Sequence, residues 1–191
     1  MTATADSTAD STADATADTA CLAAHGEATT DPARDPATAP LVVAVFATGV
    51  ATQLVHFAHH LGWRTVVVDP AGVPDDVAAA ADTVAAGLTP ELVEGADVVL
   101  TDHHRDELGP LLRDALAARA RWVGIMGSPR HEAPHPAALR ALGVDEEQIA
   151  RVHRPIGLDI GSHTPPEIAL STLAGLVADR AGRDGAFYDR R

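Results

Sequence analysis

The feature that most constrains the fold is a strand, helix, strand pattern at residues 41–69. Residues 41–46 are a continuous apolar run of strand length, typical of a parallel strand buried on both faces. A helix is predicted at about 50–61, ended by Gly62, and residues 65–69 form a second buried strand. In such a βαβ unit a right-handed crossover joins two adjacent parallel strands.

Strands and helices continue to alternate along the rest of the chain. Further strands are predicted at 96–101 and 122–126, with a weak one at 82–86, and further helices at 78–81, 105–119, 136–142, 145–152 and 165–180. This alternation predicts an α/β fold with a Rossmann-like, doubly wound, mainly parallel sheet of four clear strands and one weak strand.

Residues 1–40 differ in composition from the rest of the chain. Residues 2–20 contain only Thr, Ala, Asp and Ser, which cannot bury enough apolar surface to offset the entropy of ordering. A helix here would stack like charges four residues apart, at Asp6, Asp10, Asp14 and Asp18. We therefore predict a disordered acidic tail and linker at 1–40, acting as a solvated spacer or a partner-binding arm, and one domain at 41–185.

The charge balance excludes several classes of function. The 14 basic residues are all Arg and the net charge is −13. Without Lys, the chain has no P-loop, Schiff-base lysine or lysine general base. The acidic body disfavours nucleic acid and anionic membranes as partners. Cys21 is the only cysteine, and neither a membrane-span run nor a secretion signal is evident, so we expect a cytoplasmic protein.

In a doubly wound sheet, ligands bind beyond the carboxyl ends of the strands, so the loops that follow strands are the candidate sites. The loop at 47–52 is a degraded dinucleotide fingerprint that keeps Gly49 but has Ala47 and Thr52 at the positions of the first and third glycines. Asp69 ends the second strand, where a carboxylate can accept from ribose hydroxyls or simply cap a turn.

Histidines supply a second group of candidates. The strand at 96–101 is followed by a polar and ionisable run, Thr101-Asp102-His103-His104-Arg105-Asp106, which is a candidate reactive or metal-like site. One of its two histidines can be functional, although Asp102 can also just cap the next helix. His56, His59 and His60 have helical spacing that suits zinc, but a solvated face explains them better, since no carboxylate or Cys is near them in that helix.

Two loops near the C-terminus complete the set. Residues 124–130 combine a flexible turn, a hydroxyl and the guanidinium of Arg130, which suit a phosphate or carboxylate, or form an ordinary turn. Residues 155–161 form a glycine-containing loop with no evident structural need. Thr164 and Glu167 form a capping box, with Pro165 as first residue of the last helix.

These last segments carry a family resemblance. Gly-Ser-x-Arg at 127–130, Pro-Ile-Gly-Leu-Asp-Ile-Gly at 155–161 and Thr-Pro-x-Glu-Ile-Ala at 164–169 closely resemble the carboxyl-terminal Rossmann domain of the XdhC/CoxI family, over about 41–182. The resemblance implies a maturation factor that binds the molybdenum cofactor (molybdopterin), assists its sulfuration through a cysteine desulfurase, and delivers it to a xanthine dehydrogenase-like molybdenum hydroxylase. It places Gly127, Ser128, Arg130, Gly157, Asp159, Gly161 and Glu167 at motif positions.

The sequence departs from the family at three points. Ala47 replaces the first glycine of the Gly-x-Gly pattern, Asp102 follows Thr101 so that His103 is offset by one residue, and the repetitive tail stands where members have another domain. Such changes are consistent with weakened cofactor binding, a separate partner or lost activity.

The leading hypothesis is therefore a cofactor-binding accessory protein, possible as a homodimer. Its expected cofactor-binding residues are Gly49, Asp69, His103, Gly127, Ser128, Arg130, Gly157, Asp159 and Gly161, with Arg130 on the phosphate. No catalytic residue is assigned. The alternatives are an NAD(P)-dependent oxidoreductase, with His103 or His104 as acid or base, and a degenerate Rossmann module that binds only a protein partner.

Overall fold

The computed structural model describes residues 38–128, 130 and 132–187. The chain divides into two units, Met1–Thr38 and Ala39–Arg191, and every helix and strand described below belongs to the second. The predicted N-terminal tail lies almost wholly outside the described residues, so its disorder remains a prediction.

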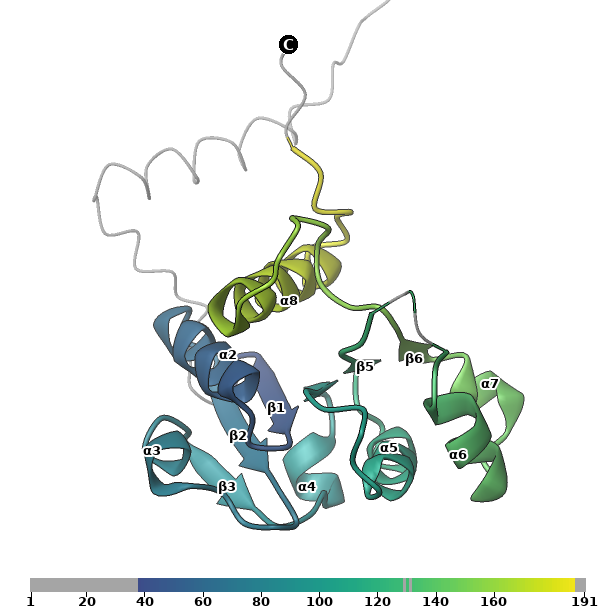
Figure 1. Cartoon of the computed structure of the whole chain (residues 1–191). Coiled ribbons are helices and arrows are strands. Elements are labelled where there is room, and N and C mark those ends of the chain that lie inside the picture. The colour runs from purple at the N-terminus through teal and green to yellow at the C-terminus, as the bar shows by residue number, and fades with distance from the viewer. Residues whose placement is uncertain (1–37, 129, 131, 188–191) are drawn as a thin grey trace, which may run out of the picture. The chain divides into compact units, whose positions relative to one another are not determined.

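The second unit is built around a six-stranded sheet (Figure 1). The strands lie in the order β3-β2-β1-β4-β5-β6 and every neighbouring pair is parallel. Strand order reverses between β1 and β4, which is the switch point of a Rossmann fold. The predicted α/β, doubly wound architecture is confirmed. The strands are β1 (Leu41–Val45), β2 (Arg64–Val68), β3 (Thr83–Ala85), β4 (Asp97–Leu100), β5 (Trp122–Ile125) and β6 (Val152–His153).

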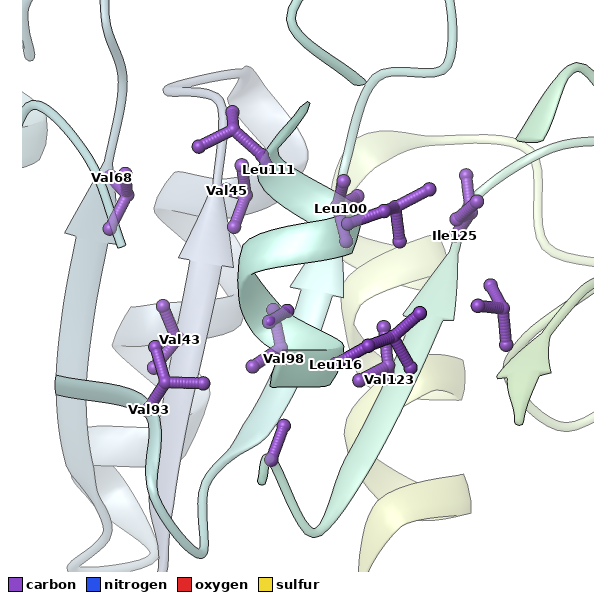
Figure 2. Packing of buried hydrophobic residues seen from close by; sticks show 14 of the residues in the cluster. Val43, Val45, Val68, Val93, Val98, Leu100, Leu111, Leu116, Val123 and Ile125 are labelled. Carbon is purple, nitrogen blue, oxygen red and sulfur yellow. The ribbon is translucent and has the colours of Figure 1, made fainter. Parts of the chain in front are cut away.

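Helices cover both faces of this sheet. The helices are α2 (Gly49–His60), α3 (Asp75–Ala78), α4 (Pro90–Val93), α5 (Leu108–Ala117), α6 (His135–Ala141), α7 (Glu146–Ile149) and α8 (Pro165–Arg180). Because successive side chains of a strand point to opposite faces, β1 contributes to both core layers. Val42 and Ala44 join the apolar residues of α2 and α8, whereas Val43 and Val45 join those of α4–α7 (Figure 2).

One buried carboxylate ties α8 to the amino end of the sheet. Asp97 begins β4 and has no solvent exposure. Its Oδ1 accepts from Arg121 Nε at 2.5 Å and its Oδ2 from Arg180 Nε at 2.7 Å. Arg180 also lies over the ring of Trp63, 5.2 Å from the centroid. Two guanidinium groups thus compensate a carboxylate that would be costly to bury alone.

Several predicted boundaries were wrong. The predicted helix at 145–152 ends at Ile149, and Val152 instead begins β6, a strand that the sequence did not indicate. The short helix α4 was also missed, and α3 lies three residues before the predicted 78–81. The weak strand at 82–86 is real, as β3 pairs with β2.

Among the described residues, we find no helix that has both the length and the apolar character needed to cross a membrane.

Candidate functional site

The carboxyl ends of the strands meet at one edge of the sheet, and β1 ends there in an unusual turn. Phe46, the next residue, is fully buried and has φ of 71°, a left-handed conformation that is strained for a bulky side chain. Its amide donates to the Val68 carbonyl, and its carbonyl accepts from the Thr101 hydroxyl at 2.8 Å. These bonds from β2 and the β4 loop hold the strained turn in place.

The predicted fingerprint loop is held by hydroxyl groups of its neighbours. Thr48 caps α2, since its Oγ1 accepts from the Ala51 amide at 3.2 Å. The same hydroxyl donates to Thr101 Oγ1 at 2.8 Å. Gly49 is the exposed first residue of α2, and a Cβ there would lie 3.9 Å from the ring of Pro165 at the start of α8. The helix N-terminus is therefore partly satisfied by the protein's own groups.

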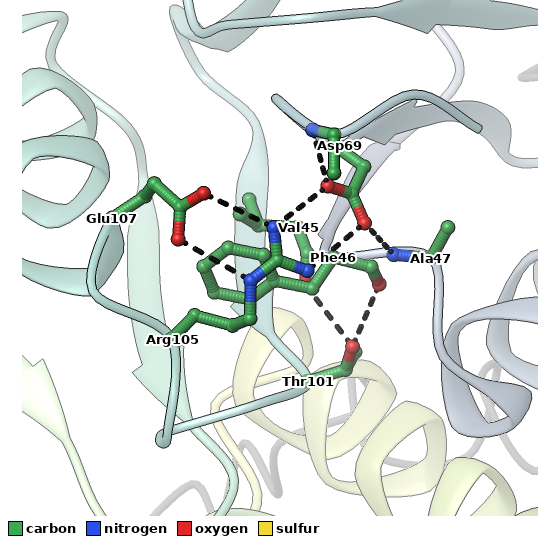
Figure 3. Close-up of polar contacts among 8 residues, drawn as sticks. Val45, Phe46, Ala47, Asp69, Thr101, Arg105 and Glu107 are labelled. Atoms are coloured by element: carbon green, nitrogen blue, oxygen red, sulfur yellow. Dashed lines mark hydrogen bonds and ion pairs between the residues drawn. The ribbon is translucent and has the colours of Figure 1, made fainter.

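Asp69 is buried just beyond β2 and accepts hydrogen bonds from two sides (Figure 3). Oδ2 accepts from the Ala47 amide at 3.0 Å, and Oδ1 accepts from the Ala71 amide at 2.9 Å. Arg105 Nη2 reaches Oδ1 at 3.1 Å, and its Nη1 lies 3.5 Å from Oδ2. Burial favours the neutral acid, but the two amides and Arg105 outweigh it and hold the pKa of Asp69 below its ordinary value.

Arg105 pairs with two carboxylates at the part of the edge beyond β1 and β2. Its guanidinium also binds Glu107, with Nη2 to Oε1 at 3.2 Å and Nε to Oε2 at 3.3 Å, and lies over the Phe46 ring, 4.8 Å from the centroid. The hydrogen bonds that Arg105 donates to Glu107 and then to Asp69 raise the pKa of Arg105, and Arg105 in turn lowers the pKa of Glu107. The helix predicted at 105–119 is shorter in the structure, from Leu108 to Ala117, so Arg105 and Glu107 precede it.

The other half of the edge lies beyond β5. Gly127 and Ser128 are half-buried, and Arg154, which follows β6, packs on them. A Cβ on Gly127 would lie 2.6 Å from Arg154 Nε, so only glycine leaves room for that guanidinium. Arg154 Nη2 donates to the Ser128 carbonyl at 3.2 Å. Arg130 is exposed, and its amide donates to Ser128 Oγ at 3.2 Å.

A buried histidine accompanies this loop. His135, the first residue of α6, is 6% exposed, and its Nδ1 has no hydrogen-bond partner among the described residues. Burial, with a smaller effect of the Arg154 charge, lowers the pKa of His135 below its ordinary value. His135 is therefore a neutral side chain with one ring nitrogen unsatisfied.

The loop at 155–161 has a structural role that the sequence analysis did not expect. Gly157 has φ of 87°, and a Cβ there would lie 2.4 Å from Ser171 Oγ in α8. Ser171 accepts from the Leu158 amide through its carbonyl and donates to the Leu158 carbonyl through its hydroxyl. Gly157 is thus needed for close packing against α8, whereas Asp159 is exposed and a Cβ on Gly161 would meet nothing within 4 Å.

The remaining sequence candidates are Asp102 and the histidines. His103 is half-buried, with its ring centroid 3.9 Å from that of His104. Asp102 accepts from the His104 amide, a turn contact. The α2 histidines, His56, His59 and His60, are exposed, as a solvated face predicts. Within the described ranges, no group of three potential metal ligands occurs. The predicted capping box of Thr164 and Glu167 is confirmed.

Four of the predicted cofactor-binding residues lie at two places along the carboxyl edge of the sheet. Gly49 and Asp69 lie on the β1–β2 half, together with Arg105, and Gly127 and Ser128 lie on the β5–β6 half, together with Arg154. Arg105 belongs to the candidate run at 101–106 but was given no role there, and Arg154 was not among the predicted residues. A correct end for the helix predicted at 145–152 would have left room for a strand at 152–153. Arg154 would then have followed a strand at the carboxyl edge of the sheet, which is where site residues are expected.

Comparisons with known proteins agree with the sequence motifs. The model of the XdhC Rossmann domain matches residues 42–176. The uncharacterized protein YqeB of Escherichia coli K12 is 38% identical over 80 residues, which are 42% of this chain and 14% of YqeB. A xanthine dehydrogenase crystal structure from Bacillus halodurans resembles the fold with a TM-score of 0.58 and 24% identity, over 78% of this chain and 45% of that chain.

The chain thus spans less than half the length of either relative. The family match, by contrast, includes nearly the whole sheet and both halves of its carboxyl edge. Since that match extends over more than half of the 191 residues, the chain belongs to the XdhC family, through its Rossmann domain.

Proposed function

We propose that this chain is a non-catalytic accessory protein, which binds the molybdenum cofactor and delivers it to a xanthine dehydrogenase-like molybdenum hydroxylase. The observation that carries the proposal is the arrangement beyond β5, where Arg154 packs on Gly127 and Ser128 in a domain of the XdhC family. Glycine and serine backbone groups under a guanidinium suit the phosphate that molybdopterin carries.

The residues present fit such a phosphate group. A guanidinium carries five donors in a planar fork, and Arg154 uses one of them on the Ser128 carbonyl. His135 Nδ1 is a buried polar atom without a hydrogen-bond partner in the described part of the chain. Arg130 adds a second positive charge on an exposed part of the same loop. The expected role of Arg130 on the phosphate is thus shared with Arg154 in this proposal.

The NAD(P)-dependent alternative is less well supported. A dinucleotide needs an acidic side chain at the end of the second strand that accepts from its ribose. Asp69 occupies that place, but it already accepts from two amides and from Arg105. A module that binds only a protein partner predicts no cofactor binding, which the titration below tests.

The test is a titration of the full chain with molybdopterin, and in parallel with NADH. We expect saturable binding of molybdopterin and at least tenfold weaker binding of NADH. Arg154→Gln should weaken molybdopterin binding about tenfold or more, and Arg130→Gln should weaken it less. Arg113→Gln is the matched control, because Arg113 lies on α5 and pairs with its neighbour Asp114.

Two results would contradict the proposal. One is an absence of saturable molybdopterin binding to the folded wild-type chain, and the other is tighter binding of NADH than of molybdopterin.

The proposed partners are tested by co-purification with a molybdenum hydroxylase or a cysteine desulfurase. The proposed homodimer is tested by the mass of the free protein in solution. The cytoplasmic location stays a prediction.

A further inference from the structure

The carboxylate oxygens of Asp69 already accept hydrogen bonds from groups of the protein itself. An ionised carboxylate offers about four acceptor positions. Asp69 receives four contacts, two from the Ala47 and Ala71 amides and two from the Arg105 guanidinium. Its side chain is 7% exposed. A ribose diol can therefore reach this carboxylate only by displacing Arg105, because the two amides belong to the turn itself.

Arg105 is held in place independently of Asp69. Glu107 accepts from both its Nε and its Nη2, and the Phe46 ring lies beneath the guanidinium (Figure 3). A hydroxyl group that displaced Arg105 from Asp69 would replace an ion pair with a bond from a neutral donor. The contact with Asp69 is thus a fixed part of the site.

The charge of this half also disfavours a phosphate. Asp69 and Glu107 carry two negative charges against the single positive charge of Arg105. Beyond β5, by contrast, Arg130 in the loop and Arg154 after β6 supply two positive charges, against the single negative charge of Glu132. A ligand that spans the edge would therefore place its phosphate at β5 and have no favourable place for a ribose at β2.

We propose that Arg105 determines the specificity of this site: by occupying the Asp69 carboxylate it excludes a ribose diol, so that the chain accepts a cofactor ending in a phosphate monoester and rejects its dinucleotide forms. The inference rests on the function proposed above, because it names which form of the cofactor that function uses. Arg105 acts here by exclusion, through its ion pair with Asp69.

A first experiment tests the exclusion without the molybdenum cofactor. ADP-ribose is titrated into the full chain, and we expect Arg105→Gln to bind it at least tenfold more tightly than wild type. Glu107→Gln, which loosens Arg105 and leaves Asp69 unchanged, should give a smaller gain in the same direction. The gain should disappear when Asp69→Asn is combined with Arg105→Gln. Arg113→Gln should behave as wild type.

A second experiment compares molybdopterin with its cytosine dinucleotide form. Wild type should prefer the monoester at least tenfold, and Arg105→Gln should reduce that preference. The inference is overturned if folded Arg105→Gln and Glu107→Gln both bind ADP-ribose no better than wild type, or if wild type binds both cofactor forms equally. If wild type binds neither cofactor form while Arg105→Gln gains ADP-ribose, the proposed function is wrong and the exclusion by Arg105 stands.

Discussion

Replacing Asp97 tests the link between the sheet and α8. Asp97→Asn keeps the volume of the side chain but removes the charge that binds Arg121 and Arg180. Each charge-assisted bond contributes about 1.5–3 kcal/mol, so the loss of both would cost roughly 3–6 kcal/mol. The arginine side chains are 30% and 24% exposed, which lets water offset part of this cost, and Arg121 keeps its bond to Asp179.

We therefore expect Asp97→Asn to lower the free energy of unfolding by about 3 kcal/mol, a large part of the 5–15 kcal/mol that is usual for a domain. For a domain of this size, the midpoint of thermal unfolding should fall by roughly 6–12 °C. Urea unfolding followed by circular dichroism measures the first quantity, and calorimetry measures the second.

The matched control is Glu146→Gln, which breaks an exposed pair with Arg140. A surface pair contributes about 0–1 kcal/mol and is screened by salt, whereas a buried pair is screened much less. The effect of Asp97→Asn should therefore persist in 1 M NaCl. A loss below about 1 kcal/mol, or a loss that salt removes, would refute the conclusion that this carboxylate anchors α8.

Three further predictions follow from single positions. Gly157→Ala should lower the free energy of unfolding in urea by about 2 kcal/mol or more, because its Cβ would lie 2.4 Å from the Ser171 hydroxyl and its φ is 87°. Gly87→Ala is the control and should be nearly neutral, since a Cβ there meets nothing within 4 Å. Gly127→Ala should weaken molybdopterin binding by displacing Arg154, with little change in the thermal midpoint; unchanged affinity would contradict this. The pKa of His135 lies below 6.5, so the unfolded chain binds more protons and stability should fall as pH drops below about 6.5. His135→Gln should flatten the urea-unfolding profile between pH 7 and 5.5, and an unchanged slope would contradict the assignment.

The fold could be predicted because its signals are local. The apolar runs that form β1, β2, β4 and β5 have the length of buried strands, and each is followed by a segment that was predicted to be helical. β6 escaped prediction because it has only two residues, Val152 and His153, and exists through pairing with β5. Such pairing depends on tertiary contacts that a short run of sequence does not encode.

The candidate site was predictable only in its glycine and acidic positions. Asp69 and Gly127 occur in recognisable patterns, and the structure places both at the carboxyl edge of the sheet. Arg105 was expected at the start of a helix and Arg154 was assigned to no element, yet they bind partners 36 and 26 residues away. Asp97 was predicted only as part of the strand at 96–101. Its role was not visible in the sequence because its two arginine partners come from other parts of the chain.

The degraded fingerprint loop is consistent with a site that no longer needs a pyrophosphate. In a dinucleotide site, the glycines let the backbone approach the ligand and leave the amides of the helix N-terminus for its phosphates. Here the Ala47 amide donates to Asp69, and the Ala51 amide donates to Thr48. The strained turn at Phe46 is held by bonds within the protein. Because the protein's own side chains accept from these two amides, neither amide is open to a ligand phosphate, which agrees with the proposal that the phosphate binds beyond β5.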